Sequence, residues 1–395
     1  MNRARAKEKF FKYLFAFTAV MCIIAVIAIF VFLIAESIPA FKKIGFFNFV
    51  FGNKWTPDSS DTYGGELHGR YGVFKMIIGT LVATVGSVTF GGVLGFFTAT
   101  FISKFCHDKL KTVFTAVINL LAGIPSVIFG FFGMKVLLPM LGIFSANGSG
   151  AGLLAVSLVL GLMILPTVVS LSKTSIDAVP QSYYEGARAL GATHEQAVFG
   201  AVVPAAKSGI IASIVLGIGR AVGETMAVIM VAGNSVNYPE GLFKSFRVLT
   251  ANIVMEMGYA GEVQLGALIA TGVVLLVFIF LINLLLGFVT KGKKIDKAKR
   301  KRNIEWLSAF NYKIKIEKIG RIFSYICAAF AAVGLIAIIG FVCVMGIPHR
   351  GRNKYFAFDS RYAFNRPYKF DYRYSRWRVY RDIFKRVYQK GQQNS

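Results

Sequence analysis

Two opposite charges stand inside a long apolar run of this chain. Arg220 and Glu224 lie within residues 208–232, whose other members are apolar or small and uncharged. If this run forms one membrane-spanning helix, a spacing of four residues places both side chains on one helical face. A charge in mid-membrane costs about 2.5–3.5 kcal/mol on insertion scales, so such residues usually line a cavity or find a partner.

These two charges could serve transport or packing. A guanidinium offers a planar fork of donors, which suits the oxygens of a passing oxyanion. Glu224 could hold Arg220 in position, keep the resting site from trapping an anion, or accept a proton from it. Alternatively, the two charges simply neutralise each other, and the residues alone leave both readings open. Gly219 and Gly223 have the spacing of close helix–helix packing in lipid.

Seven apolar runs are long enough to hold these charges in a membrane. They cover residues 14–35, 73–102, 113–141, 151–171, 208–232, 263–290 and 322–345. At about 1.5 Å of rise per residue, each can cross a hydrocarbon layer of about 30 Å. Pro125 interrupts the third run, and because proline removes a backbone hydrogen bond, we expect a kinked or broken helix there. We interpret the first run as an uncleaved anchor.

The composition agrees with a membrane protein. Charged residues make up 16% of the chain, compared with about 25% in soluble domains. The net charge of +26 does not indicate a nucleic-acid partner, because residues 291–395 hold 25 of the 45 Lys and Arg but only 6 of the 19 Asp and Glu. The scattered Cys and His residues predict neither disulfides nor a metal site. We expect no cofactor and no enzyme activity, because the chain has no phosphate-binding loop for ATP.

The basic residues also predict an orientation. Lys and Arg cluster before the first run, after the second and after the sixth, which places these segments in the cytoplasm by the positive-inside rule. Residues 36–72, 142–150 and 233–262 then lie outside. The cytoplasmic segment 172–207 is amphipathic, and Ser182 to Glu185 offers a start like a capping box. Such a helix would suit docking on a soluble partner.

A motif in this segment points to a family. Glu185-Gly186-Ala187 is followed by three residues, Gly191, nine residues and Ala201-Val202-Val203-Pro204. The spacing resembles the EAA loop of MetI-like, importer-type ABC permeases, although Gly186, Ala201 and Val203 depart from its usual letters. The resemblance implies a helix, a glycine turn and a second helix that sit in a groove of a separate ATPase. Glu185, Gly186, Ala187, Gly191 and Pro204 are the implied coupling residues.

Two further strings resemble the PstC-type permeases of phosphate importers. They are GIPSVIFGFFG at residues 123–133 and GIGRAVGETMAVIMVAGN at residues 217–234, and the likeness extends over about residues 10–295. It implies that Arg220 and Glu224 lie on the phosphate path, with Pro125 and Ser126 as further candidates. The implied partners are a PstA-like second permease, two PstB-like ATPase subunits, a PstS-like extracytoplasmic phosphate-binding protein and the lipid bilayer.

The predicted fold is all-α and polytopic in the bacterial inner membrane. We expect an anchor and outer loop at residues 1–72, a five-helix permease core at 73–295, and a basic linker with an extra span at 296–349. That span resembles the start of a PstA-type permease. Residues 350–395 carry 13 Lys and Arg against 3 Asp, on the side where the positive-inside rule does not expect them.

Alternatives remain for the tail and for the function. The tail is a basic aromatic arm for anionic lipid or nucleic acid, or, as we prefer, a non-native, out-of-frame or disordered stretch after a fused second permease. For the permease, a sulfate or molybdate importer is the nearest alternative to phosphate. An ATP-independent channel would not need the EAA-like loop.

Overall fold

The computed structural model describes residues 2–58, 69–145, 148–290 and 313–346. These residues are almost entirely helical, and the strands among them form one short antiparallel pair in which Trp55 opposes Tyr71. Five helices are long and apolar enough to cross a membrane, or seven spans if two bent helix pairs each count as one. The expected all-α, polytopic fold is therefore confirmed.

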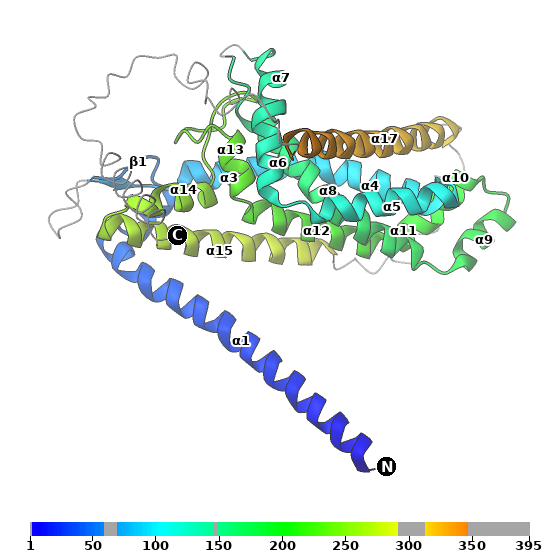
Figure 1. The fold of residues 1–395 in the computed structure, drawn as a ribbon, viewed down its shortest axis with the longest axis horizontal. Coiled ribbons are helices and arrows are strands. Elements are labelled where there is room, and N and C mark those ends of the chain that lie inside the picture. The colour runs from blue at the N-terminus through cyan, green and yellow to red at the C-terminus, as the bar shows by residue number, and fades with distance from the viewer. Residues whose placement is uncertain (1, 59–68, 146–147, 291–312, 347–395) are drawn as a thin grey trace, which may run out of the picture. The chain divides into compact units, whose positions relative to one another are not determined.

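Figure 1 shows the order of the elements along the chain. They are α1 (Asn2–Ile44), α2 (Phe46–Phe51), β1 (Trp55–Thr56), β2 (Arg70–Tyr71), α3 (Phe74–Ser87), α4 (Val93–Thr100), α5 (Asp108–Gly123), α6 (Ser126–Phe132), α7 (Leu138–Gly142), α8 (Leu153–Asp177), α9 (Gln181–Ala189), α10 (His194–Ala197), α11 (Val203–Ala205), α12 (Lys207–Gly223), α13 (Met226–Val231), α14 (Leu249–Glu256), α15 (Glu262–Thr290) and α17 (Lys313–Gly346). Wider π turns at Val88–Gly92, Phe101–Phe105, Gly133–Leu137 and Val198–Val202 continue several of these helices, and a 3-10 turn, Met257–Tyr259, follows α14.

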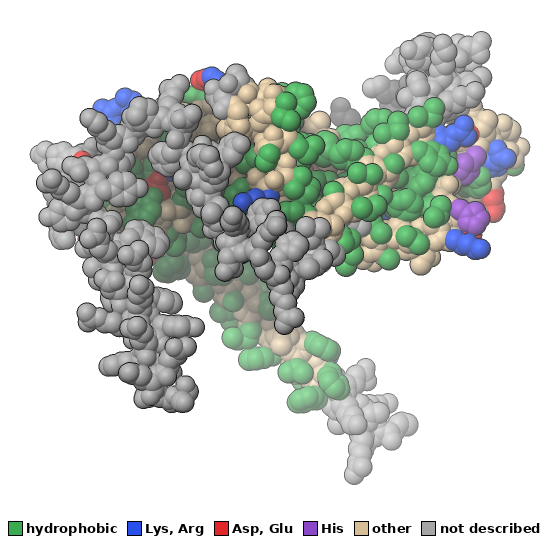
Figure 2. Space-filling view, turned by 45° about the horizontal axis from the view of Figure 1, so that its top comes forward, with side chains coloured by type: hydrophobic (Ala, Val, Ile, Leu, Met, Phe, Trp, Pro, Cys, Tyr) green, Lys and Arg blue, Asp and Glu red, His purple; other side chains and the backbone are tan. Residues whose placement is uncertain are grey.

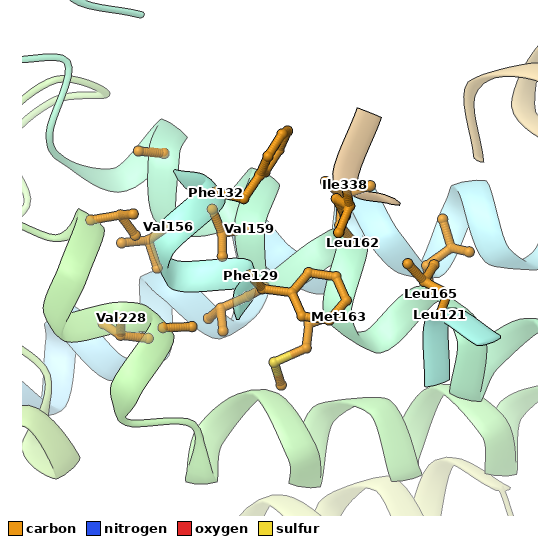
Figure 3. Close-up of a cluster of buried hydrophobic side chains, with 14 of the residues drawn as sticks. Leu121, Phe129, Phe132, Val156, Val159, Leu162, Met163, Leu165, Val228 and Ile338 are labelled. Carbon is orange, nitrogen blue, oxygen red and sulfur yellow. The ribbon is translucent and has the colours of Figure 1, made fainter. Parts of the chain in front are cut away.

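Helix α8 forms the centre of the main core. Most of its residues are buried, including Val159, Met163 and Leu165. Figure 3 shows Phe129 of α6 and Val228 of α13 packed around this helix. Glycines allow the closest approach: a Cβ added at Gly91 would lie 2.3 Å from the carbonyl oxygen of Gly161. Small residues at such contacts let helix backbones meet in a membrane protein.

Two helices of the core are broken rather than straight. Helix α5 and the segment Ser126–Gly142 meet at an angle of 94°, at the break that Pro125 predicts. The segment His194–Ala205 meets α12 at 68°. A further break was not expected: α12 ends at Gly223, and the chain restarts as the separate short helix α13. The expectation of one continuous helix over residues 208–232 is therefore wrong.

A second hydrophobic cluster lies where α1 meets α15. The Cβ of Ala40 would lie 3.3 Å from a Cβ added at Gly266 of α15. Phe49 and Tyr71 are fully buried in this cluster, together with Val73 and Met76 at the start of α3. The apolar window of α1 is otherwise unburied by the rest of the chain, as a membrane anchor in contact with lipid would be.

The C-terminal helix α17 packs on the core beside α4. Phe323 and Tyr325 contact Phe97 and Phe101, each with ring centroids 4.7 Å apart. The described residues belong to one compact unit. The expected linker at 296–312 and the expected basic tail at 350–395 lie outside the described residues.

Candidate translocation path and coupling segment

Arg220 lies in the last turn of α12 and is half-buried. Its guanidinium donates a hydrogen bond to the hydroxyl of Thr167 in α8, 3.2 Å away. Thr167 follows Pro166, the proline inside α8. Among the described residues, Arg220 forms no ion pair. Most of the five N–H donors of the guanidinium therefore have no partner in the described part of the chain.

Glu224 does not share a helical face with Arg220. Its backbone is extended (φ −73°, ψ 130°), because α12 ends one residue earlier. Its carboxylate accepts a hydrogen bond from the backbone N–H of Ala227 at 3.2 Å, and its carbonyl accepts one from the hydroxyl of Thr250 at 3.1 Å. The reading of Arg220 and Glu224 as a self-neutralising pair on one helix is therefore wrong. Glu224 instead shapes the turn between α12 and α13.

Pro125 and Ser126 form the other break. Ile124 is extended after the end of α5, Pro125 precedes α6, and Ser126 is the first residue of α6. Helix α6 follows the break at Pro125, and α13 follows the break after Gly223. These two helices pack together, since a Cβ added at Gly130 would lie 2.8 Å from the Cα of Ala227. The structure thus brings together α6 and α13, the two short helices that start at the predicted path residues.

The small residues near Arg220 differ from expectation. A Cβ added at Gly219 or Gly223 would meet no atom within 4 Å, whereas one added at Gly217 would lie 3.2 Å from the side chain of Val168. Within the described chain, the predicted close packing at Gly219 and Gly223 is wrong, and Gly217 makes the contact with α8.

The predicted coupling residues form a helix, a glycine turn and a second helix. Gly191 has a φ of +85°, a left-handed conformation that glycine adopts without penalty. The N–H groups of Ala192 and Gly191 donate to the carbonyls of Ala187 and Arg188, at 3.1 and 3.0 Å. This pair of bonds defines a Schellman turn, which satisfies the last carbonyls of a helix.

Helix α9 has no buried residue, and Glu185 and Gly186 are exposed on it. Leu190, just after this helix, is 90% exposed. The expected capping box at Ser182 is wrong, because α9 starts at Gln181 without a side-chain cap. A capping box occurs instead at Thr193 and Gln196, at the start of α10. Pro204 lies in the first turn of α11, before the 68° bend.

His194 fixes this segment to the core. One ring nitrogen lies 2.8 Å from the hydroxyl of Tyr184, and the other lies 3.0 Å from the carbonyl oxygen of Lys104. Its ring also makes an edge contact with Phe105. His194 carries no signal in the sequence, because a lone histidine belongs to no pattern. Figure 2 shows histidine and charged side chains gathered at the α9–α10 end, next to a stretch of mostly hydrophobic side chains.

The opposite end of the bundle holds a buried ion pair that the sequence analysis missed. Arg247 and Glu256 approach to 2.5 Å, and their side chains are 13% and 8% exposed. Both stand in residues 233–262, which were expected to lie outside the membrane and to carry mixed or little charge. The only sequence signal for this pair is that Arg247 and Glu256, which have opposite charges, flank the mostly apolar residues 248–255. The described residues contain no cluster of His, Cys, Asp or Glu that could hold a metal ion.

Several known proteins resemble this chain. The probable ABC transporter permease protein YqgH of Bacillus subtilis is 37% identical over 281 residues, which cover 70% of this chain and 89% of that protein. The phosphate transport system permease protein PstC of Haemophilus influenzae is 32% identical and covers 72% of this chain and 96% of its own length. The solved structure of the MetNI methionine ABC transporter covers 55% of this chain and 93% of its own, at 20% identity and a TM-score of 0.43.

The family comparison covers the same core. The family model described as a binding-protein-dependent transport system inner membrane component matches residues 91–295. This range contains the break at Pro125, the α9–α11 segment, the bend before α12, Arg220 and the break after Gly223. It makes up more than half of the chain, and the YqgH likeness covers a larger share, 70%. The chain therefore belongs to the family of binding-protein-dependent transport system inner membrane components, the permease subunits of ABC importers.

Proposed function

We propose that this permease passes inorganic phosphate from an extracytoplasmic binding protein to the cytoplasm. The charge of Arg220, which forms no ion pair with any described residue, is the observation that carries the proposal. Support also comes from relatives named phosphate transport system permease protein PstC, which are about 30% identical. The name of the YqgH relative prints no substrate. The next nearest substrates, sulfate and molybdate, are oxyanions too.

Arg220 is suited to an oxyanion in three respects. It is half-buried between membrane helices, where a charge acts more strongly than in water. It has no carboxylate partner among the described residues. Its single hydrogen bond to Thr167 orients the guanidinium while leaving the remaining donors available. An anion at this point would therefore be stabilised by charge and by more than one hydrogen bond.

In this proposal, Glu224 acts by holding the turn between α12 and α13 in place, not by binding the anion. Its carboxylate holds the first turn of α13, and its carbonyl holds α14 through Thr250. With α6 packed against α13, a movement of one broken helix is passed to the other. Pro125 and Ser126 begin α6 on the same path.

The α9–α11 segment is the proposed contact for the ATPase subunits. Its exposed residues Glu185, Ala189 and Leu190 give a mixed polar and apolar surface, and the Gly191 turn sets the angle between the two helices. This function requires the segment and the N-terminus to lie in the cytoplasm. The proposed complex contains this chain, a PstA-like permease, two PstB-like ATPases and a PstS-like phosphate-binding protein.

Competition for uptake tests the substrate. Cells that depend on this importer are given labelled phosphate with an excess of unlabelled phosphate, arsenate, sulfate or molybdate. We expect phosphate and arsenate, which share tetrahedral shape and carry a proton near neutral pH, to suppress uptake, while sulfate and molybdate, which are tetrahedral but unprotonated, leave it unchanged. Uptake of labelled sulfate or molybdate, without uptake of phosphate, would overturn the phosphate assignment and leave the permease function intact.

A further inference from the structure

Glu256 is a junction of three elements at the α14 end of the bundle. It is the last residue of α14 and is 6% exposed. One carboxylate oxygen accepts a hydrogen bond from Arg247 at 2.5 Å. The other accepts from the indole N–H of Trp55 in β1 at 2.7 Å and from the amide of Gln264 in α15 at 2.8 Å. The carboxylate thus ties β1, α14 and α15 together.

Arg247 extends this junction to the chain that follows α13. Its guanidinium also donates to the backbone carbonyl of Asn234 and to the side-chain oxygen of Asn252, both at 2.9 Å. Asn234 is the non-glycine residue with a positive φ, +62°, within the described chain. An ion pair held away from water is favourable only when its remaining hydrogen bonds are satisfied. Here Nε and one terminal nitrogen of Arg247 and both carboxylate oxygens of Glu256 are hydrogen-bonded, and one of the partners, Trp55, lies 201 residues from Glu256 in the sequence.

The other end of α14 touches the Glu224 turn. Thr250 donates a hydrogen bond to the carbonyl oxygen of Glu224 at 3.1 Å, and the N–H of Leu249 donates to the hydroxyl of Thr80 in α3 at 3.1 Å. Helix α14 has eight residues, so it spans about 12 Å at 1.5 Å per residue. It is a short rigid rod between the Glu256 junction and the turn after Arg220.

We propose that Glu256 is a positioning residue for the translocation path, acting through α14 on the Glu224 turn. Held by Trp55, Arg247 and Gln264, Glu256 fixes one end of the rod. The fixed rod keeps Thr250 against Glu224 and so sets the direction of α13. The inference rests on the proposed function only in taking the Glu224 turn as part of the path.

A double-mutant test distinguishes two contacts that act together through α14 from two contacts that act independently. Trp55→Phe removes only the indole donor at one end of α14, and Thr250→Val removes only the hydroxyl at the other end. Each is introduced into the complete importer, and phosphate uptake is measured at equal membrane abundance. We expect each single variant to slow uptake about 3- to 10-fold, as loss of one hydrogen bond implies. The double variant should be less than 2-fold slower than either, because both contacts act by fixing the same position of α14, which either loss already shifts.

Distant sites that act independently have additive free energies, so their rate effects multiply. A double variant slowed by the product of the two single effects would overturn the proposal. So would a Trp55→Phe variant with wild-type uptake. The matched control is Tyr238→Phe, which removes a hydrogen bond to Asn53 at the same end of the bundle without touching α14. It should leave uptake unchanged.

A second readout does not depend on the substrate. In a background without the four native cysteines, Thr225→Cys places a thiol in the Glu224 turn, and its rate of modification is measured in the detergent-purified importer. We expect Trp55→Phe and Thr250→Val each to raise that rate at least 3-fold. An Ala189→Cys thiol in α9 should react at an unchanged rate. If the wild type takes up no phosphate, the proposed function fails, yet an accelerated Thr225→Cys reaction still supports the linkage and an unchanged one refutes it.

Discussion

The guanidinium of Arg220 donates a hydrogen bond to the hydroxyl of Thr167, 3.2 Å away, across the contact between α12 and α8. Arg220 is thereby oriented by a neutral partner, while Glu224, four residues on, uses its carboxylate at the start of α13. A neutral partner fixes the position of a cation without cancelling its charge. This arrangement suits a site that must attract an anion and then release it.

Replacement of Thr167 tests that orientation. Thr167→Val keeps the shape of the side chain but removes the acceptor. We expect phosphate uptake to fall about 2- to 10-fold, the equivalent of about 0.5–1.5 kcal/mol for one hydrogen bond. Thr167→Ser restores an acceptor and should retain most of the uptake. Wild-type uptake by Thr167→Val would show that Arg220 does not need this contact.

Two glycines of the coupling segment form a matched pair. A Cβ at either Gly186 or Gly191 would meet no atom within 4 Å, but only Gly191 has a positive φ. Gly191→Ala should therefore cost about 1–2 kcal/mol through backbone strain alone and reduce the phosphate moved per ATP hydrolysed. Gly186→Ala lies within helix α9 and should be neutral or stabilise by up to about 1 kcal/mol.

Thermal unfolding and coupled uptake of the two variants in the assembled importer check this prediction. Equal effects of both substitutions would mean that the left-handed turn at Gly191 is not what the segment requires.

Removal of Glu256 should destabilise the protein more than removal of the whole ion pair. Glu256→Ala leaves Arg247 almost buried without a counter-charge, and breaking a buried pair in this way costs about 3–5 kcal/mol. The double substitution Arg247→Met with Glu256→Met removes both charges and should lose less. Unfolding midpoints of the detergent-purified chain measure the difference. A double variant less stable than Glu256→Ala would contradict it.

Local sequence signals predicted much of the fold. The apolar runs identified the long helices, and Pro125 identified the 94° break because a proline acts on its own backbone and that of its neighbours. The resemblance of the segment from Glu185 to Gly191 to the EAA loop likewise implied a helix followed by a glycine turn, and a Schellman turn is built from residues close in sequence.

The features that could not be predicted from the sequence depend on contacts between distant residues. The break after Gly223 has no proline to announce it, and Thr250 holds it from 26 residues away. Trp55 and Glu256 are separated by 201 residues, and no periodicity relates them. The same limit explains why Arg220 and Glu224 were read as neighbours on one helix: the i, i+4 rule applies only while the helix continues.

The most direct test of the account is phosphate uptake by Arg220→Gln, measured together with ATP hydrolysis by the assembled importer. Glutamine keeps hydrogen-bonding groups near Thr167 but removes the charge that attracts the anion. We predict uptake at least 10-fold below wild type with the ATPase subunits still bound and active, and partial recovery in Arg220→Lys, which restores the charge without the planar fork. Full-rate uptake by Arg220→Gln would contradict the claim that this charge lies on the path.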